Sequence, residues 1–167
     1  MTSQTQSAVA ALRNITPKLN KVTDSANAAV REAERVLAEI GVGLPAEVQF
    51  DAGDYRGGDE DGYSVRCRLL SFERVSGKFR ICIVDETRSG SALEHDRFGD
   101  TVLTGEAVTS RQVFLWDQAN RETRLEAVTV LGQLIEELAG KAQQVSERAE
   151  AAIQPATDIL DSLRERQ

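Results

Sequence analysis

The chain of 167 residues is poor in several residue types, and each scarcity excludes a class of protein. Two cysteines and one histidine are too few for a disulfide framework or for a zinc site built from these residues. Aromatic residues make up 5% of the chain, which suits closely packed helices better than a thick globular core. The sequence has no P-loop, GxGxxG, HExxH or CxxC motif. We therefore expect no cofactor, no metal and no enzymatic activity.

Long apolar runs and an excess of positive charge are missing as well. No stretch approaches the roughly 20 apolar residues that span a bilayer. The first residues, MTSQTQSAVAALRN, lack the cationic start and the continuous apolar run of a secretory signal. A formal net charge of -7 argues against a protein that coats nucleic acid. These features predict a cytoplasmic protein that does not contact a membrane.

Both ends of the chain show the pattern of long helices, predicted over residues 3–41 and 117–165. Apolar or small residues alternate in steps of three and four, which keeps them on one helical face. Gly41 stands where a left-handed C-cap is expected. Pro17 makes a separate or kinked first piece an alternative, and Pro155 predicts a kink rather than an end. The first stripe contains Leu12, Ile15, Leu19, Val22, Ala26, Ala29, Ala33, Val36 and Ile40, and the second runs from Val128 to Leu163.

The middle of the chain, residues 46–116, is predicted to form β-structure. Short β-like runs cover residues 46–50, 63–75, 78–86 and 111–116, whereas residues 87–110 show no period and are expected to form a long loop. A two-residue turn at Ser76-Gly77 pairs Val75 with Lys78 and continues into a regular hairpin. In this register Cys67 and Cys82 stand roughly 13 Å apart along the strands, too far for a disulfide.

Together these segments predict one α+β domain over residues 1–167. Two long antiparallel coiled-coil-like helices, N- and C-terminal, are expected to frame a small antiparallel β-sheet of three to four strands. This layout resembles that of prefoldin-type chaperone subunits, which also place β-hairpins between two terminal coiled-coil helices. The resemblance is one of layout alone and rests on no sequence motif.

The apolar stripe is wider than a two-helix seam requires, because further apolar residues fall four positions after core positions. We interpret them as a self-association stripe that joins the long helices of two chains in a homodimer. The alternative is that the helices fold back on the sheet and bury these residues within one chain. The stripe comprises Val30, Leu37, Leu125, Ala139, Ile153 and Leu160.

The predicted hairpin is the most basic part of the chain. Its cations form a candidate patch for an anionic ligand or nucleic acid, with Glu73 the one acid between Ser64 and Ile83. The alternative, a solvated or internally paired face, is favoured because Glu73, Asp85 and the acidic loop at residues 51–61 offer partners within the chain. The patch comprises Arg66, Arg68, Arg74, Lys78 and Arg80.

Three further features carry weaker signals. The acidic loop at residues 51–61 does not match the EF-hand spacing, so a flexible acidic turn is favoured over a calcium site. His95 has no nucleophile assigned to it, and we expect a solvent-exposed loop residue rather than a catalytic base. Trp116 stands where the sheet meets the C-terminal helix. We expect it to plug that joint, and an exposed partner-binding anchor is the alternative.

The expected function is that of a non-enzymatic oligomeric scaffold, adaptor or client-binding protein with a protein partner. A nucleic-acid-associated protein that binds through the basic hairpin is the second hypothesis, and an enzyme is the third.

Overall fold

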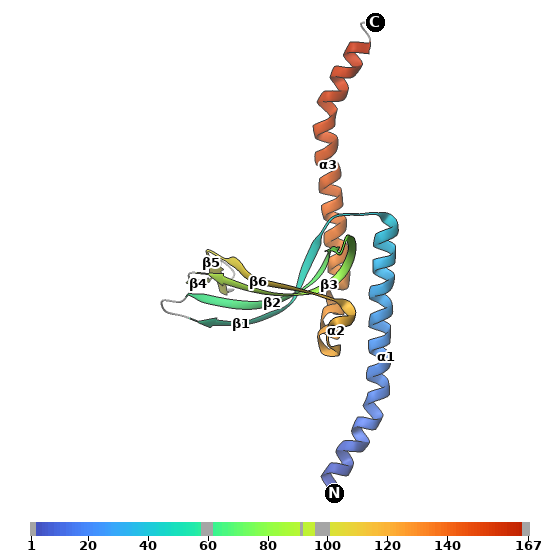
Figure 1. Ribbon diagram of the computed structural model, residues 1–167, viewed down its shortest axis with the longest axis vertical. Helices are drawn as coiled ribbons and strands as arrows, with labels where there is room; N and C mark the ends of the chain where they lie inside the picture. The colour runs from blue at the N-terminus through green and yellow to red at the C-terminus, as the bar shows by residue number, and fades with distance from the viewer. Residues whose placement is uncertain (1–2, 58–61, 91, 96–100, 165–167) are drawn as a thin grey trace.

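The computed structural model describes residues 3–57, 62–90, 92–95 and 101–164. One long helix precedes the strands, and three short helical segments lead from the last strand into a second long helix (Figure 1). The elements are α1 (Ser3–Ile40), β1 (Ala46–Gly57), β2 (Tyr63–Val75), β3 (Lys78–Gly90), β4 (Ala92–His95), β5 (Thr101–Thr104), β6 (Ala107–Leu115), η2 (Trp116–Gln118), α2 (Arg121–Ala127), η3 (Val128–Val130) and α3 (Leu131–Arg164).

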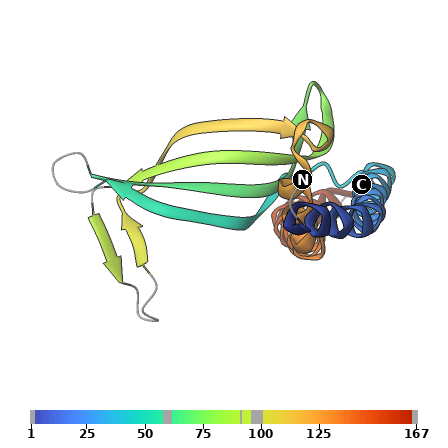
Figure 2. The ribbon, with the colours of Figure 1, turned by 90° about the horizontal axis from the view of Figure 1, so that it is seen from below.

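The strands form a four-stranded antiparallel sheet in the order β1-β2-β3-β6 and a two-stranded sheet of β4 and β5. The larger sheet projects away from the helices, and the small sheet lies at its far end (Figure 2). The predicted hairpin register is confirmed, since Val75 pairs with Lys78 across the turn. Ser76 and Gly77 both have positive φ, 49° and 85°, as a type I′ turn requires.

The prediction of a long loop over residues 87–110 is wrong. Strand β3 continues to Gly90, β6 already begins at Ala107, and β4 and β5 pair with each other in between. The extension of β3 to Gly90 depends on a strand that is distant in sequence, because residues 82–89 of β3 pair with β6. Local periodicity carries no signal for such pairing.

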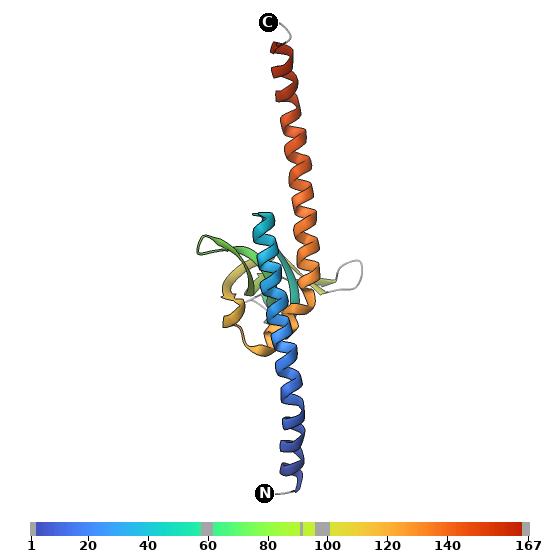
Figure 3. The ribbon, with the colours of Figure 1, turned by 90° about the vertical axis from the view of Figure 1, so that its right-hand side faces the viewer.

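The predicted pair of long antiparallel coiled-coil-like helices is wrong. Helices α1 and α3 run in the same direction, and the last part of α1 lies at the same level as the beginning of α3, beside the sheet (Figures 1 and 3). The two chain termini therefore lie at opposite ends of an elongated molecule. The resemblance to the prefoldin layout fails for the same reason.

The direction of α3 follows from the short segments before it. The predicted helix over residues 117–165 is broken: Asn120 caps α2 by accepting a hydrogen bond from the Thr123 N–H at 2.9 Å, and η3 joins α2 to α3. In Figure 1, α2 lies below the sheet, so the chain enters α3 from that side and runs back past the sheet. Both long helices continue through their internal prolines, Pro17 and Pro155.

The hydrophobic core lies between one face of the sheet, the C-terminal half of α1 and the first turns of α3. Val30 and Leu37 of α1 are buried in it, although the sequence assigned both to self-association. For these two residues the alternative interpretation, burial against the sheet of the same chain, is confirmed. The core also contains Leu70, Phe72, Ile81, Ile83, Trp116, Ala127, Leu134 and Leu138.

Helix α1 also closes an open edge of the sheet. Strand β6 ends opposite Cys82, so no strand of the described chain pairs with the first residues of β3 on that side. The Glu34 carboxylate of α1 accepts a hydrogen bond from the Ile81 N–H at 2.7 Å. This contact satisfies a backbone donor that would otherwise be available to an additional strand. The end of α1 is formed as predicted: Gly41 has φ 69°, and its N–H donates to the Leu37 carbonyl at 3.1 Å.

The burial of Val30 and the exposure of Val36 give a direct test of this helix orientation. Val30 is 1% exposed and Val36 is 37% exposed. Replacement of Val30 by Ala should lower the free energy of unfolding by about 2 kcal/mol, because two buried carbons are lost and a cavity remains. The same replacement at Val36 should change it by less than about 0.5 kcal/mol. Urea denaturation of both variants at equal protein concentration measures the difference, and equal losses would contradict the orientation.

Candidate functional site

The basic residues of the hairpin do not form one surface. Arg66 is ion-paired with Asp85, and Arg68 lies 3.4 Å from both Asp85 and Asp51 and 3.7 Å from Glu126. Acids of the same chain thus pair with two of the five basic residues of the predicted patch.

The other three cations point elsewhere. The Arg74 guanidinium donates to the Gly77 carbonyl of the turn at 3.2 Å. Arg80 lies on the opposite face of the hairpin from Arg66 and reaches Glu34 of α1 at 3.5 Å. Arg80 and exposed Lys78 line a hollow of about 530 Å³ between α1 and the hairpin. This distribution supports the internally paired interpretation.

A cluster of ion pairs that the sequence did not reveal surrounds Glu86. Its side chain is 3% exposed, and its two oxygens accept hydrogen bonds from Arg88 Nε at 2.5 Å and from Arg111 Nη1 at 2.9 Å. Arg111 also donates to Glu73 at 2.5 Å and to Glu47 at 3.2 Å. The cluster therefore ties β1, β2, β3 and β6 together on the sheet face opposite the helices.

The two arginines of this cluster are held in their charged form. Burial alone would lower the pKa of Arg111, but the hydrogen bonds that it donates to Glu73 and Glu86 outweigh burial and hold the pKa above its ordinary value. Burial opposes the positive charge of Arg88 too, and its hydrogen bond to Glu86 again leaves the pKa raised. Both guanidiniums stay charged at any accessible pH, so this cluster is suited to holding strands together rather than to proton transfer.

The two cysteines are free and buried, in agreement with the predicted absence of a disulfide. Burial raises the pKa of both thiols, that of Cys82 to about 11, and nearby Glu73 adds to the effect at Cys82. A thiol with so high a pKa is a poor nucleophile near neutral pH.

Trp116 plugs the joint between the sheet and the helices, as predicted. Its ring is 8% exposed, and its Nε1 donates to Asn27 Oδ1 of α1 at 2.9 Å. Arg124 of α2 donates to the same oxygen at 3.1 Å. The Nε of Arg124 is buried and has no hydrogen-bond partner among the described residues. One amide oxygen thus joins α1, η2 and α2, and Trp116 is not available as an exposed anchor.

The structure describes only some of the residues in the acidic loop and around His95. Asp51 pairs with Arg68, whereas residues 58–61 of the acidic loop lie outside the described chain. His95 belongs to strand β4 rather than to a loop, and its side chain is not among those described. Within the described ranges, no group of three or more His, Cys, Asp and Glu side chains is placed to hold a metal ion.

The remaining members of the predicted self-association stripe differ from Val30 and Leu37. Leu125 is half-buried and lines a hollow of about 550 Å³ together with Leu19 of α1. Ala139 and Ile153 are exposed, and the side chain of Leu160 is outside the described set. The stripe is thus divided between the core and the surface.

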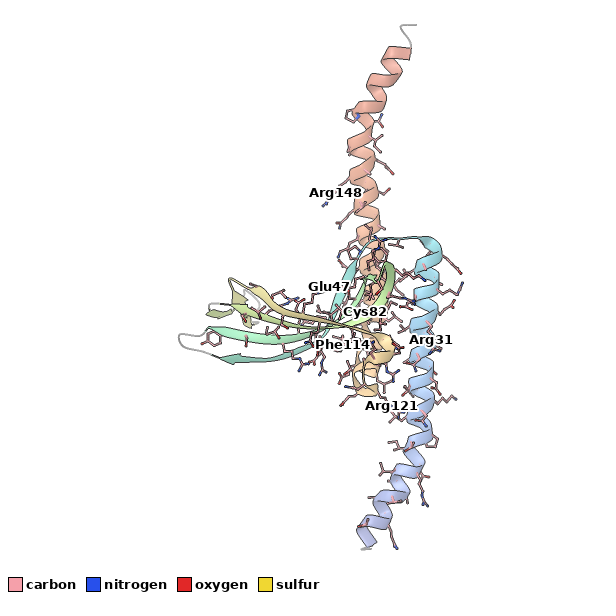
Figure 4. The ribbon with its side chains drawn as sticks, in the orientation of Figure 1. Arg31, Glu47, Cys82, Phe114, Arg121 and Arg148 are labelled. Carbon is pink, nitrogen blue, oxygen red and sulfur yellow. The ribbon has the colours of Figure 1, made fainter. Side chains whose placement is uncertain are left out.

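Exposed apolar residues recur along the parts of the two long helices that extend beyond the sheet. Every side chain from residue 5 to 22 of α1 is exposed, and so is every one from 143 to 155 of α3. We call residues 3–22 the N-terminal arm and residues 143–164 the C-terminal arm. The two arms point in opposite directions, and Arg148 on the C-terminal arm lies well away from the sheet (Figure 4).

Each arm continues the face by which its helix packs on the sheet. Leu12 and Leu19 are spaced by seven residues from each other and from Ala26, which is buried. Leu138 is buried, and Val145 and Ala152 follow it at the same spacing on α3. The apolar face of each helix therefore continues, with the same spacing of apolar residues, from the part covered by the sheet into the exposed arm.

Comparison with protein-family models, curated proteins and solved structures gives no match for this chain. In the part of the chain that the structure describes, neither long helix has an apolar stretch that could cross a bilayer.

The sequence signalled some of these features and missed others. Trp116 and the arms follow from local patterns. The Glu86 cluster could not be found because it depends on the pairing of β6 with β3, which places Arg111 opposite Glu86. The cluster could be predicted only if residues 87–110 were first assigned to the paired ends of β3 and β6.

Removal of the charge at Glu86 should destabilise the sheet. Replacement of Glu86 by Gln leaves Arg88 and Arg111 without their shared anion, and the free energy of unfolding should fall by about 2–3 kcal/mol. The matched replacement of Glu47, which is 42% exposed, should cost less than about 1 kcal/mol. Chemical denaturation checks both, and a similar small loss for the two variants would show that the buried carboxylate contributes little.

The raised thiol pKa values predict low reactivity in the folded protein. At pH 8 the thiolate of Cys82 should make up about one thousandth of that thiol, and burial further restricts access. Ellman's reagent should therefore label neither cysteine appreciably at pH 8 and both after denaturation. Reactivity should increase as the pH is raised toward 11. Rapid labelling of the native protein at pH 8 would contradict the burial of both thiols.

Proposed function

We propose that this protein is a non-enzymatic scaffold that self-associates through its helical arms and presents its β-sheet to a protein partner. The exposed, heptad-spaced aliphatic residues of the arms carry this proposal. Leu12 is 62% exposed, Ile15 57% and Val22 55%, all on a continuous helix. Each such side chain contributes roughly 1.5–3 kcal/mol when it is fully buried. A soluble chain rarely leaves so regular an apolar stripe exposed unless another surface covers it.

The stability of the arms supports the same conclusion. Helices in proteins owe most of their stability to packing of an apolar face rather than to helix propensity. The N-terminal arm also contains Pro17, which removes one backbone donor. Contact with another surface would therefore stabilise the arms as helices.

The polar groups support a role without catalysis or nucleic-acid binding. The arginines beside Glu86 form ion pairs with it. Arg66 and Arg68 of the hairpin form ion pairs with Asp85 of the same chain. We place the protein in the cytoplasm, where its two buried thiols would remain reduced.

Loss of the apolar stripe should abolish self-association. The wild-type chain should form a particle of twice the 18.3 kDa chain mass, whereas a Leu12→Glu/Leu19→Glu variant should associate at least about 100-fold more weakly. Sedimentation velocity over a concentration series measures this change. The near-ultraviolet circular dichroism of buried Trp116 verifies that the core of the variant is folded.

The matched control is Ser7→Glu/Asn14→Glu, which places two glutamates on the opposite side of the same arm. Both residues are exposed, and this variant should retain the wild-type mass. A wild-type chain that remains monomeric at its highest soluble concentration would overturn the proposal. So would equal effects of the two double substitutions.

A further inference from the structure

We infer that the two arms pair reciprocally between two copies of this chain: the N-terminal arm of one copy lies antiparallel against the C-terminal arm of the other. This inference rests on the proposed self-association and specifies its geometry. It recovers, between chains, the antiparallel helix contact that the sequence pattern wrongly assigned within one chain.

The placement of the arms favours this arrangement. Helices α1 and α3 run in the same direction, and their arms leave opposite ends of the molecule (Figures 1 and 3). A two-fold axis perpendicular to the long axis reverses one copy, which brings each N-terminal arm beside the partner's C-terminal arm. The arms of 20 and 22 residues are each roughly 30 Å long, so neither overhangs the other. Two equivalent contacts, related by the two-fold axis, thereby cover both arms of both copies and close the assembly.

Pairing of like arms does not achieve this. If two N-terminal arms pair, both C-terminal arms stay exposed at the far ends. A further copy is then needed to cover them, and the assembly grows as an open chain rather than closing as a dimer.

The charges of the arms select the same pairing. The N-terminal arm carries three cations, Arg13, Lys18 and Lys21, and no acid. The C-terminal arm carries four acids and two arginines, a net charge of -2. Contact between unlike arms therefore joins opposite charges, whereas contact between two N-terminal arms would place three cations against three.

The sizes of the apolar side chains are complementary as well. The N-terminal arm presents large residues at its seam, including Ile15, Leu19 and Val22. The C-terminal arm presents small residues, Ala149 and Ala152, beside the larger Val145. A seam of large against small residues lets two helices approach closely and leaves few voids. Two N-terminal arms would instead bring large residues against each other.

Cross-linking between singly substituted chains tests this geometry. A tagged chain with Leu19→Cys is mixed with an untagged chain carrying Ala149→Cys, allowed to exchange subunits, and treated with a short bis-maleimide. The mixture should give at least about tenfold more cross-linked dimer than either chain alone, because the new thiols meet only between unlike arms. A parallel experiment with Ala152→Cys covers the neighbouring position on the same face. The wild-type chain, with both thiols buried, gives the background.

The outcomes distinguish the inference from the proposed function. Strong cross-linking of the Leu19→Cys chain with itself would show that like arms pair, which overturns the reciprocal geometry although self-association stands. Dimers in sedimentation without a cross-link in any mixture would also overturn it. Monomers in sedimentation would overturn both. Retention of the dimer mass by each cysteine variant shows that the substitutions themselves do no damage.

Discussion

The limited extent of the sheet constrains everything else in this molecule. Helix α1 has 38 residues, yet among its described side chains, residues 5–40, the buried ones lie between Thr23 and Leu37. Helix α3 has 34 residues, and the last buried side chain within its described part, residues 131–155, is Leu138. The apolar face of each helix thus continues far beyond the surface that covers it. Because apolar area exposed to water is unfavourable, the uncovered lengths determine which contacts the molecule must still make.

The contacts around Asn27 set the directions in which the uncovered parts of α1 and α3 extend. Its side-chain oxygen accepts hydrogen bonds from Trp116 and Arg124 and so fixes α1 against the segments that follow β6. These segments bring the chain to one side of the sheet before α3 begins, and α3 consequently runs parallel to α1 rather than back along it. A direct β6-to-α3 connection on the other side would have allowed the intramolecular hairpin of helices. The direction of α3 is therefore a property of a few residues at the joint, not of the long apolar stripes.

Local chemistry explains what the sequence could predict. The Ser76-Gly77 turn set the register of the β2–β3 hairpin, Gly41 marked the end of α1, and the position of Trp116 indicated a plug. A heptad stripe, however, specifies a face and not its partner or direction. Val30 and Leu37 therefore proved to be core residues, and the seam expected within the chain is exposed. Arg111 likewise became recognisable only through the pairing of β3 with β6, which brings together residues distant in sequence.

Amide hydrogen exchange over a protein concentration series tests most directly whether a second copy covers the arms. Amides of residues 5–22 and 143–155 should gain protection as concentration rises, and both arms should do so over one concentration range, while β2 and β3 stay protected throughout. Fast exchange of both arms at every concentration, beside a protected sheet, would contradict the central claim that these helices are completed by another molecule of the same chain.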